Sequence, residues 1–367
     1  MEEVRRVARA LSAKGKGVLA SDESPKTIGR RLEKHGIENC EENRRKYRNL
    51  FYSASIGSAI SGAILFPETL LQSTDNGTPF VKSLNDQGVL VGVKVDEGLE
   101  KLEAGLEGET RTKGLDSLAD RLKLYKEQGA VFAKWRAAIR ICKTKDEIGE
   151  TYTCSETALE TNAIELAAYA KICHEVGVCP IVEPEILIDG DHGIDVSESI
   201  SKRVLSICIT HLWLYNVDLS AILLKPQMVV PGVDSGERAR SDEIALRTLR
   251  VLRQTVPPAV PGIMFLSGGQ SEAQATENLN MLNVMSKSSE DLFAPWALSF
   301  SFGRGLQASV LHIWSTKGPG SEEECKTMAT KIAEVNGAAT RGAYFLEKHP
   351  SVMSHEDNLQ ETFRGHY

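Results

Sequence analysis

The chain has 367 residues, of which 41% are hydrophobic and 25% are charged, and these fractions are typical of a folded globular protein. They exclude collagen-like, disordered and disulfide-scaffold classes. With 43 Lys and Arg against 50 Asp and Glu the net charge is −7, so general attraction to nucleic acid or to an acidic membrane is not expected. A local cluster of cations in a cleft could still bind an anionic substrate.

Membrane insertion and disulfide bonds are not expected either. No stretch of 18 apolar residues occurs, and the first residues, MEEVRRVARALSAKGKG, have the pattern of an amphipathic helix without the apolar block of a signal peptide. The seven cysteines are scattered and never spaced as C-x-x-C, which favours reduced thiols. We therefore expect a soluble protein of the cytoplasm.

Eight segments along the chain have the composition of buried strands. Most are near-continuous apolar runs, which is typical of parallel strands covered on both faces. They span residues 15–23, 59–66, 89–96, 130–136, 178–186, 220–226, 262–269 and 296–304.

Helical patterns separate several of these segments. Apolar residues recur at helical spacing within 115–125, 163–173, 200–208 and 244–252. One strand and its helix take about 40 residues, and eight such units in series are the number that closes a (β/α)8 barrel. A doubly wound open sheet is the alternative, but LASDESPKTIG, at and after the first strand, lacks the Gly-rich phosphate motifs typical of that fold.

The same pattern indicates a single domain. No Ser-, Gly- or Pro-rich linker interrupts the series, so residues 1–346 are expected to form one barrel with an N-terminal and a C-terminal helix. Ser321 and Glu324 have the spacing of a capping box, which predicts a long final helix through about Leu346. The tail 347–367, which ends in Tyr367, is polar and without periodicity, so we expect it to be mobile.

Ionisable and small polar residues are concentrated where the predicted strands end. The active site of a (β/α)8 barrel lies at the carboxyl ends of its strands. Charged side chains inside apolar runs are costly to bury without partners, so their convergence predicts a site, although any one of them alone would be a solvated rim residue. The residues at these ends are Asp22, Glu68, Lys94, Asp96, Lys134, Arg136, Glu183, Glu185, Lys225, Ser267–Gly269 and Gly303–Arg304.

Three of these residues are lysines that could act as an amine nucleophile. Lys225 follows Ala-Ile-Leu-Leu and precedes Pro226, so its amine emerges from a dry strand near other cations. Burial and like charge both favour the neutral amine, which is the form that attacks a carbonyl carbon. Lys225 is favoured on this ground, with Lys134 and Lys94 as alternatives.

Two glutamates and one aspartate are candidates for proton transfer. Glu183 and Glu185 flank Pro184, and a carboxylate near a lysine can both give and take the protons of carbinolamine formation. A structural ion pair with the same lysines is the alternative for either residue. Asp22, at the end of the first strand, is a second candidate base.

Phosphate binding is expected at the last two strands. Barrels commonly bind phosphate there through glycine amides and a helix N-terminus, and here those strands end in Ser267-Gly268-Gly269 and Ser301-Phe302-Gly303-Arg304. The Arg304 guanidinium would add a bidentate partner. If Lys94, Arg136, Arg31 and Arg44 form a second cationic cluster opposite, the ligand carries an anion at each end.

A metal site is not expected. The eight histidines are scattered, and Asp189, Asp191 and His192 in DGDHG have the spacing of loop residues more than of ligands.

The sequence resembles the class I, Schiff-base-forming fructose-1,6-bisphosphate aldolases. The resemblance runs from about Gly15 to Leu311 and includes the final tyrosine. The motifs that carry it, in family order and spacing, are KGVLASDES, ENRRKYR, SGAILF, VGVKVD, FAKWR, PIVEPEIL, LLKPQM, TVPPAVPG, LSGGQSE and WALSFSFGRGLQAS.

The resemblance implies a cytoplasmic (β/α)8 homotetramer of glycolysis and gluconeogenesis, without a metal or other cofactor. Its reaction would be the reversible cleavage of fructose 1,6-bisphosphate to dihydroxyacetone phosphate and glyceraldehyde 3-phosphate. The phosphosugar would be its partner, and any second protein partner is not readable from the sequence.

The resemblance also implies a role for each site residue. Lys225 would form the Schiff base and Glu183 would be its acid/base, assisted by Glu185 and Lys134. Asp22 would handle the hydroxyl proton during carbon–carbon cleavage, and Tyr367 would bring a proton to the enamine carbon. The ketone-side phosphate would be held by Ser267, Gly268, Gly269, Ser301, Gly303 and Arg304, and the other phosphate by Lys94, Arg136, Arg31 and Arg44.

Some positions depart from the family pattern without removing a catalytic group. Pro25-Lys26-Thr27 replaces a usual glycine-containing stretch, Pro67 replaces His or Glu, and Glu97 replaces Lys. The first two lie beside the expected sugar site and leave the preference between fructose 1,6-bisphosphate and fructose 1-phosphate open. Two other classes of function remain as alternatives: a transaldolase-like Schiff-base barrel, and a scaffold that binds phosphosugars or acidic protein tails.

Overall fold

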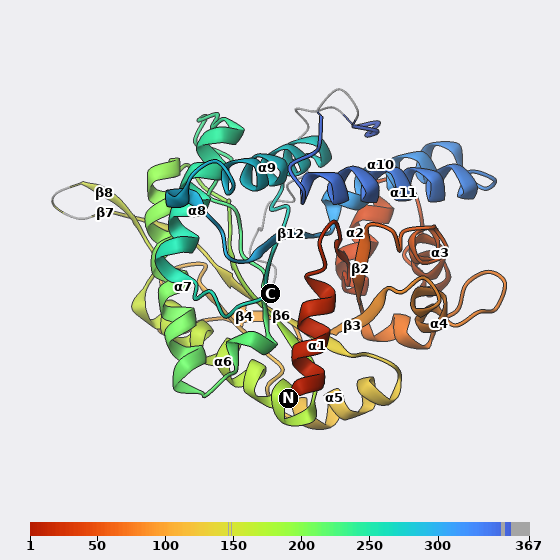
Figure 1. Cartoon of the computed structure of the whole chain (residues 1–367), viewed down its shortest axis with the longest axis horizontal. Coiled ribbons are helices and arrows are strands. Elements are labelled where there is room, and N and C mark those ends of the chain that lie inside the picture. The colour runs from red at the N-terminus through yellow and green to blue at the C-terminus, as the bar shows by residue number, and fades with distance from the viewer. Residues whose placement is uncertain (146, 148, 346–348, 354–367) are drawn as a thin grey trace.

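The structure, a computed structural model, describes residues 1–145, 147, 149–345 and 349–353. Eight parallel strands form a closed barrel in the order β1-β12-β11-β10-β9-β6-β3-β2, which confirms the predicted (β/α)8 architecture (Figure 1). Each strand lies in or overlaps one predicted segment. The strands are β1 (Gly17–Ser21), β2 (Ile60–Leu65), β3 (Leu90–Lys94), β6 (Phe132–Ile139), β9 (Cys179–Ile186), β10 (Leu223–Leu224), β11 (Gly262–Phe265) and β12 (Ala297–Phe302).

Helices surround this barrel and cover the outward faces of its strands (Figure 1). The helices between and after the strands are α2 (Pro25–Glu33), α3 (Glu41–Tyr52), α4 (Phe80–Asn85), α5 (Leu118–Glu127), α6 (Glu156–Val176), α7 (Ile194–Leu214), α8 (Ser241–Thr255), α9 (Glu272–Met285), α10 (Arg304–Lys317) and α11 (Glu322–Ala339). Short 3-10 turns are η1 (Pro67–Leu71), η2 (Leu219–Ala221) and η3 (Glu290–Leu292).

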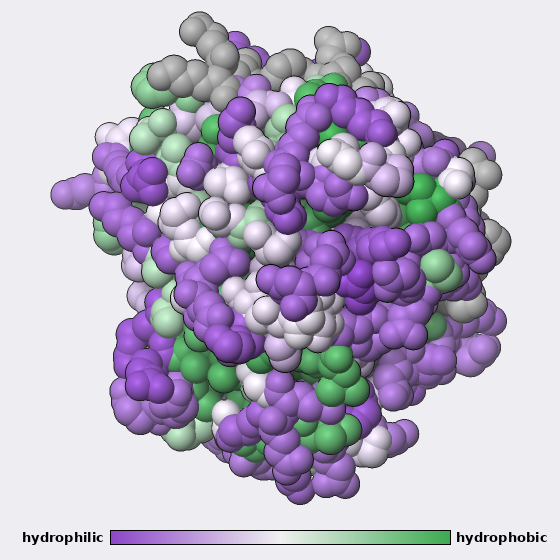
Figure 2. Space-filling model, turned by 90° about the vertical axis from the view of Figure 1, so that its right-hand side faces the viewer, coloured by the Kyte–Doolittle hydropathy of each residue, from purple (hydrophilic) through white to green (hydrophobic). Residues whose placement is uncertain are grey.

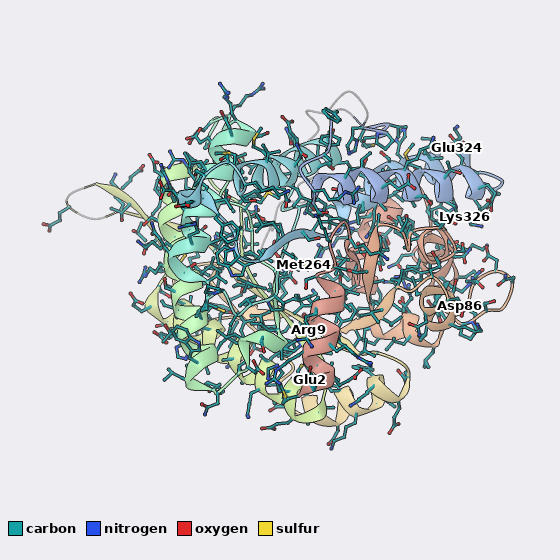
Figure 3. The ribbon with its side chains drawn as sticks, in the orientation of Figure 1. Glu2, Arg9, Asp86, Met264, Glu324 and Lys326 are labelled. Atoms are coloured by element: carbon teal, nitrogen blue, oxygen red, sulfur yellow. The ribbon has the colours of Figure 1, made fainter. Side chains whose placement is uncertain are left out.

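Side chains alternate along each strand between the barrel interior and the helix layer. On β11, Met264 packs in the interior cluster, whereas Ile263 and Phe265 pack against the helices. This is the period of two that a strand imposes, and it explains why the strands read as continuous apolar runs. In Figure 3, Met264 lies inside the molecule while the labelled charged residues lie on outer elements.

The N-terminal helix α1 (Glu2–Leu11) covers one end of the barrel interior. Its buried residues Val4, Val7, Ala8 and Leu11 recur at helical spacing and pack with the inward-facing strand residues. Charged residues such as Arg9 occupy its opposite face (Figure 3). The amphipathic pattern predicted for the first residues is therefore used to close the bottom of the barrel.

The final helix differs from its prediction. α11 ends at Ala339 and not near Leu346, because the chain turns at Gly342, which has a left-handed φ of +67°. No capping box forms: the Ser321 hydroxyl donates to the Gly318 carbonyl at 2.7 Å, and Glu324 pairs with Lys317. The predicted mobile tail from 347 lies largely outside the described residues and stays a prediction.

Two antiparallel hairpins were not predicted. The first consists of β4 (Leu99–Lys101) and β5 (Thr110–Thr112), and the second of β7 (Cys142–Lys145) and β8 (Glu150–Thr153). They follow β3 and β6 at the carboxyl ends of these barrel strands, so they belong to the face on which a barrel site lies.

The surface in Figure 2 is mainly hydrophilic, with a hydrophobic area in its lower part. None of the helices in the described residues is long and apolar enough to cross a membrane. All seven cysteines lie in the described residues, and each is a free thiol.

Candidate active site

The inward-facing positions change from apolar to charged along three neighbouring strands. The change occurs toward the carboxyl end of each of these parallel strands, and it comes one inward position earlier on β6, where Lys134 pairs with Ile181 and Arg136 with Glu183. The successive residues are Phe132, Lys134 and Arg136 on β6, Ile181, Glu183 and Glu185 on β9, and Leu223 and Lys225 at β10. The apolar residues pack in the barrel interior, and the charged residues lie directly beyond them toward the cavity.

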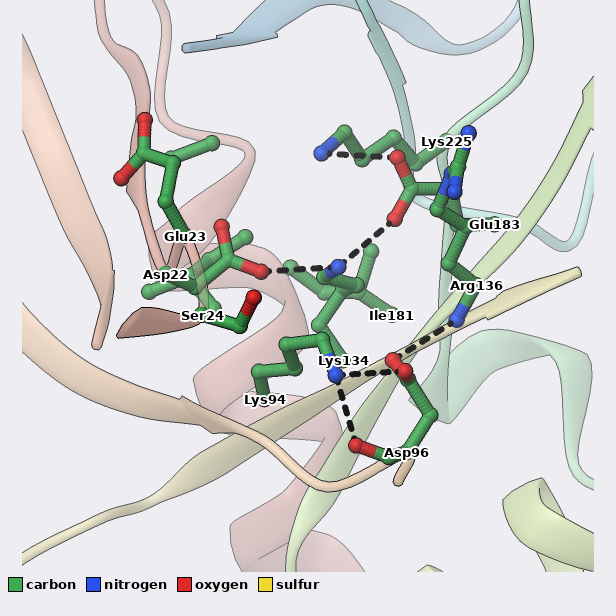
Figure 4. Close-up of polar contacts among 12 residues, drawn as sticks. Asp22, Glu23, Ser24, Lys94, Asp96, Lys134, Arg136, Ile181, Glu183 and Lys225 are labelled. Carbon is green, nitrogen blue, oxygen red and sulfur yellow. Dashed lines mark hydrogen bonds and ion pairs between the residues drawn. The ribbon is translucent and has the colours of Figure 1, made fainter. Parts of the chain in front are cut away.

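One carboxylate contacts the side-chain nitrogens of two lysines at the centre of this face (Figure 4). Glu183 Oε1 lies 3.0 Å from Lys225 Nζ, and Glu183 Oε2 lies 3.2 Å from Lys134 Nζ. Lys134 Nζ also contacts Asp22 Oδ2 at 2.8 Å. The two lysines are each 4% exposed and Glu183 is 3% exposed, so the charges are compensated by one another rather than by water.

Asp22 and Lys134, at one end of this chain of charges, have fixed protonation states at neutral pH. Burial raises the pKa of Asp22, but Lys134, Lys225 and Lys94 outweigh it and bring that pKa down to about 2. Burial lowers the pKa of Lys134, but Asp22 and Glu183 outweigh it and raise that pKa above its ordinary value. At neutral pH Asp22 is therefore a carboxylate and Lys134 an ammonium.

A second group of charges lies beside the first. Lys94 Nζ contacts Asp96 Oδ1 at 2.5 Å and the Asp96 carbonyl at 2.6 Å, and Asp96 also accepts from the Arg136 backbone N–H at 3.4 Å (Figure 4). The Arg136 guanidinium pairs with Glu185. Burial raises the pKa of Glu185, but Arg136 outweighs it, so the pKa is lowered and the carboxyl is ionised. Glu185 thus faces Arg136 and not a lysine.

A cavity of about 770 Å³ opens above these groups. This volume is in the usual range for sites that bind small molecules. Most of the residues predicted from the sequence line it, namely Asp22, Arg31, Lys94, Lys134, Arg136, Glu183, Glu185, Lys225, Ser267, Gly268, Ser301, Gly303 and Arg304.

Three of the residues to which the sequence assigns a role are not among this lining, and neither is the strand-end residue Glu68. The Arg44 guanidinium is turned to Glu68, with Nε–Oε1 at 2.8 Å and Nη2–Oε2 at 2.9 Å, because η1 presents that carboxylate to α3. Gly269 lines a separate cavity of about 640 Å³ on the other side of its loop. Tyr367 lies outside the described residues.

The cavity also contains residues that sequence reasoning missed. Lys26, Arg30, Lys113 and Arg121 line it and add to its positive charge. Lys113 follows the unpredicted hairpin β4/β5 and Arg121 lies in α5, so neither is near a predicted strand end and no pattern pointed to them. Lys26 was visible only as a departure from the family pattern.

A helix N-terminus lies at one side of the cavity. α10 begins at Arg304, which lines the cavity together with its N-cap Gly303, so backbone N–H groups and the positive end of the helix dipole are available to an anion. The Ser301 hydroxyl is buried and has no hydrogen-bond partner among the described residues. A buried hydroxyl without a partner is costly, and a phosphate oxygen would satisfy it.

Gly268 holds the loop Ser267–Gly269 in an unusual conformation. Its φ is +48°, in the left-handed region, and a Cβ at this position would lie 2.1 Å from Oε1 of Gln227. Gln227 is itself buried, and neither atom of its amide has a hydrogen-bond partner among the described residues. The loop therefore needs glycine both for its backbone and for the close approach of Gln227.

Gly268→Ala is expected to raise the KM for a phosphorylated substrate about tenfold and to change kcat less, because the displaced loop weakens binding in the ground and transition states alike. Steady-state kinetics measure both constants. Gly318→Ala is the matched control, since Gly318 has a φ of +67° and nothing within 4 Å of its added Cβ. An unchanged KM in Gly268→Ala would show that the loop does not bind phosphate.

Comparison with known proteins identifies the family. The family model of class I fructose-bisphosphate aldolase matches residues 3–364. The non-muscle fructose-bisphosphate aldolase of Lethenteron camtschaticum is 47% identical over 345 residues, which cover 94% of this chain and 91% of that protein. Fructose-bisphosphate aldolase C of Homo sapiens is 46% identical over 349 residues, with the same coverage of each chain.

A solved structure agrees with these relatives. The fructose-bisphosphate aldolase of Plasmodium falciparum, in complex with TRAP and a small-molecule inhibitor, superposes with a TM-score of 0.87 and is 41% identical. The match covers 94% of this chain and 95% of that one. The barrel, the lysine and carboxylate cluster at its carboxyl end and the matches over nearly the whole length agree: the chain belongs to the class I fructose-bisphosphate aldolase family.

Proposed function

We propose that the chain cleaves fructose 1,6-bisphosphate through a Schiff base on Lys225. The observation that carries this proposal is the 3.0 Å contact between Lys225 Nζ and Glu183 Oε1. Of the three candidate lysines, Lys134 is held as an ammonium by two carboxylates and Lys94 is bound to Asp96. Lys225 has a carboxylate partner that can accept its proton and so release the neutral amine for attack on the C2 carbonyl.

Glu183 then acts as acid and base in imine formation. After the amine adds to C2, the carbinolamine must lose its hydroxyl as water, which needs a proton donor next to the same carbon. Glu183 is next to Lys225 and receives a second contact from Lys134, which stabilises its charged form between transfers. Glu185 assists from the neighbouring position by holding Arg136.

Asp22 is the base of carbon–carbon cleavage. The iminium at C2 is an electron sink, so the C3–C4 bond can break once the C4 hydroxyl loses its proton. Asp22 is on the opposite side of Lys134 from Glu183 and is ionised at neutral pH, as this role requires. Cleavage releases glyceraldehyde 3-phosphate and leaves an enamine on Lys225.

The two phosphates occupy opposite sides of the cavity. The ketone-side phosphate binds at Ser267, Gly268, Ser301, Gly303 and Arg304, where α10 begins. The other phosphate binds among Lys94, Arg136 and Arg31, with Arg44 acting only indirectly because Glu68 holds it. The additional cations Lys26 and Lys113 at the cavity favour a bisphosphate over a monophosphate.

A coupled assay tests the reaction itself. Fructose 1,6-bisphosphate is supplied with a chelator present, and the released triose phosphates are reduced with NADH. We expect full activity with the chelator, in accord with the metal-independent chemistry of the proposal. Inactivity that divalent metal restores would contradict it.

Tyr367 delivers the proton that converts the enamine to product. Deleting Tyr367 should slow exchange of the C3 proton of dihydroxyacetone phosphate with solvent by roughly 10²-fold or more, from the lower end of the range for loss of a general acid upward, while binding of the substrate changes little. Exchange is measured by NMR in deuterated water. Equal exchange in the truncated protein would contradict this role.

Assembly and location follow the family. We infer a homotetramer, and the exposed apolar residues Trp213 and Leu214 at the end of α7 are suited to a subunit contact. Light scattering in solution would then give about four times the chain mass of 40.2 kDa. The cytoplasm is the compartment that fits a glycolytic reaction and seven free thiols.

A further inference from the structure

Glu272 is a buried carboxylate that the proposed reaction leaves unused. It is the first residue of α9, directly after the phosphate-binding loop and the N-cap Ser271, and its exposed fraction is 0%. A buried carboxylate is costly unless it is paired or fully hydrogen-bonded. Among the described residues no cation pairs with Glu272, so hydrogen bonds and the N-terminus of α9 stabilise it.

The donors to Glu272 come from two other segments of the chain. The Ser309 backbone N–H, in α10, donates to Oε1 at 3.0 Å, and the Ser309 hydroxyl donates to Oε2. The Ser351 hydroxyl, close to the end of the described chain, also donates to Oε2 at 2.6 Å. One carboxylate thus joins α9, α10 and the C-terminal segment 349–353.

Described residues on both sides of 346–348 contact one face of α9, in order toward the N-terminus of that helix. The Tyr344 N–H donates to Asn280 Oδ1 at 3.0 Å, and His349 Nε2 lies 3.2 Å from Thr276 Oγ1. Ser351 then reaches Glu272. The α9 partners are spaced by four residues and lie in descending order, so the C-terminal segment approaches the phosphate-binding loop as it approaches residue 353.

A purely structural role would not need Ser351. Ser309 alone supplies a donor to each carboxylate oxygen and already links α9 to α10. The Ser351 hydroxyl adds a third hydrogen bond to Glu272. The Val352 N–H donates to Ser309 Oγ at 3.1 Å and so strengthens the link between the C-terminal segment and α10. These two contacts fix the position of residues 351 and 352, after which the tail begins.

We propose that Glu272 is a positioning residue that docks the start of the C-terminal tail, through Ser351, onto α9 and α10, the helices that follow the phosphate-binding ends of β11 and β12. The inference rests on the proposed role of Tyr367. Docking of Ser351 at Glu272 fixes the point at which the tail begins. A fixed starting point brings Tyr367 to the enamine more often, which is a higher effective local concentration. α9 and α10 follow the ends of β11 and β12, where the phosphate-binding residues lie, so the docked segment and the bound phosphate are held by the same two strand–helix units.

The test compares Ser351→Ala with the wild type in the full chain. Loss of a hydrogen bond to a charged group should shift docking about tenfold, so proton exchange on dihydroxyacetone phosphate should slow by up to about tenfold. The KM for fructose 1,6-bisphosphate and the yield of borohydride-trapped Schiff base should stay unchanged, and backbone hydrogen exchange of residues 349–353 should accelerate. Ser286→Ala is the matched control, because Ser286 is buried at the far end of α9 and donates only locally, to the Asn283 carbonyl.

A double variant separates this inference from the proposed role of Tyr367. Combined with deletion of Tyr367, Ser351→Ala should cause no further slowing, since both changes act on the same proton transfer. Normal proton exchange in Ser351→Ala, or slowing that adds to that of the deletion, would overturn the inference while the role of Tyr367 stands. Normal exchange in the deletion itself would show instead that the proposed tyrosine step is wrong, and the inference would fall with it.

Discussion

Lys225→Met is expected to lower kcat for fructose 1,6-bisphosphate cleavage by about 10⁴-fold or more, because the step that forms the covalent intermediate is lost altogether. Methionine retains much of the volume of the lysine and places no unpaired charge in the cavity. Glu183 keeps its contact with Lys134, so the local charge remains compensated. The measurement is steady-state turnover in the coupled assay, at substrate concentrations well above KM.

Further measurements show whether the loss of turnover comes from the missing nucleophile or from a damaged fold or binding site. Lys225→Arg keeps a cation next to Glu183 but has no nucleophilic amine, so it should be as inactive as Lys225→Met. Thermal unfolding should be little changed in either variant, and so should binding of inorganic phosphate, which we propose to depend on the Ser301 and Arg304 side of the cavity. Turnover within tenfold of the wild type in Lys225→Met would contradict the assignment of the nucleophile.

Glu183→Gln is expected to lower kcat by about 10²- to 10⁴-fold, the range for loss of a positioned acid and base. The amine of Lys225 then loses the group that accepts its proton, and the carbinolamine loses its proton donor. In a single turnover, the Schiff base should form slowly but reach its normal yield at long times. Rapid-quench trapping with borohydride measures this rate.

The same variant should also be less stable. Removing the Glu183 charge leaves Lys134 and Lys225 buried with one carboxylate, Asp22, instead of two, and breaking such a buried pair typically costs about 3 kcal/mol. Glu185→Gln is the comparison, because Glu185 faces Arg136 and not Lys225. Formation of the Schiff base in Glu183→Gln at the wild-type rate would assign the acid and base to another residue.

The barrel and the centre of its site could be predicted because both depend on local periodicity. Eight apolar runs at regular intervals determine the number of strands, and the period of two along each strand places Lys134, Glu183 and Lys225 on the inward side. Parallel register then brings their carboxyl ends together. Which of Glu183 and Glu185 contacts Lys225 was left open by the sequence, and the register of β9 against β10 decides it for Glu183.

The rest of the site depends on contacts between distant segments, which periodicity does not encode. The sequence predicts Arg44 as a phosphate ligand, but in the structure its guanidinium pairs with Glu68 in η1. Lys113 lines the cavity because it follows the hairpin β4/β5, which the sequence did not predict. The need for Gln227 beside the Gly268 loop can be recognised only from the close approach of these two residues in the structure. The proposed role of Glu272 similarly depends on its contact with Ser351, which is 79 residues away in the sequence.

The final helix shows the same limit at a smaller scale. Ser321 and Glu324 have the spacing of a capping box, yet each has a nearer partner, in Gly318 and Lys317. The helix stops at Ala339 because Gly342 and the Tyr344–Asn280 contact turn the chain onto α9. A local motif predicts a cap only when no competing tertiary contact is available.

Borohydride trapping of the wild-type chain with dihydroxyacetone phosphate tests the central claim most directly. Reduction converts the imine to a stable secondary amine, and mass analysis of the tryptic peptide 204–238, in which Lys225 is the sole lysine, locates it. We predict a single adduct per chain, on Lys225, that does not form without borohydride or in Lys225→Met. An adduct on Lys134 or Lys94, or none in an active enzyme, would contradict the proposed mechanism.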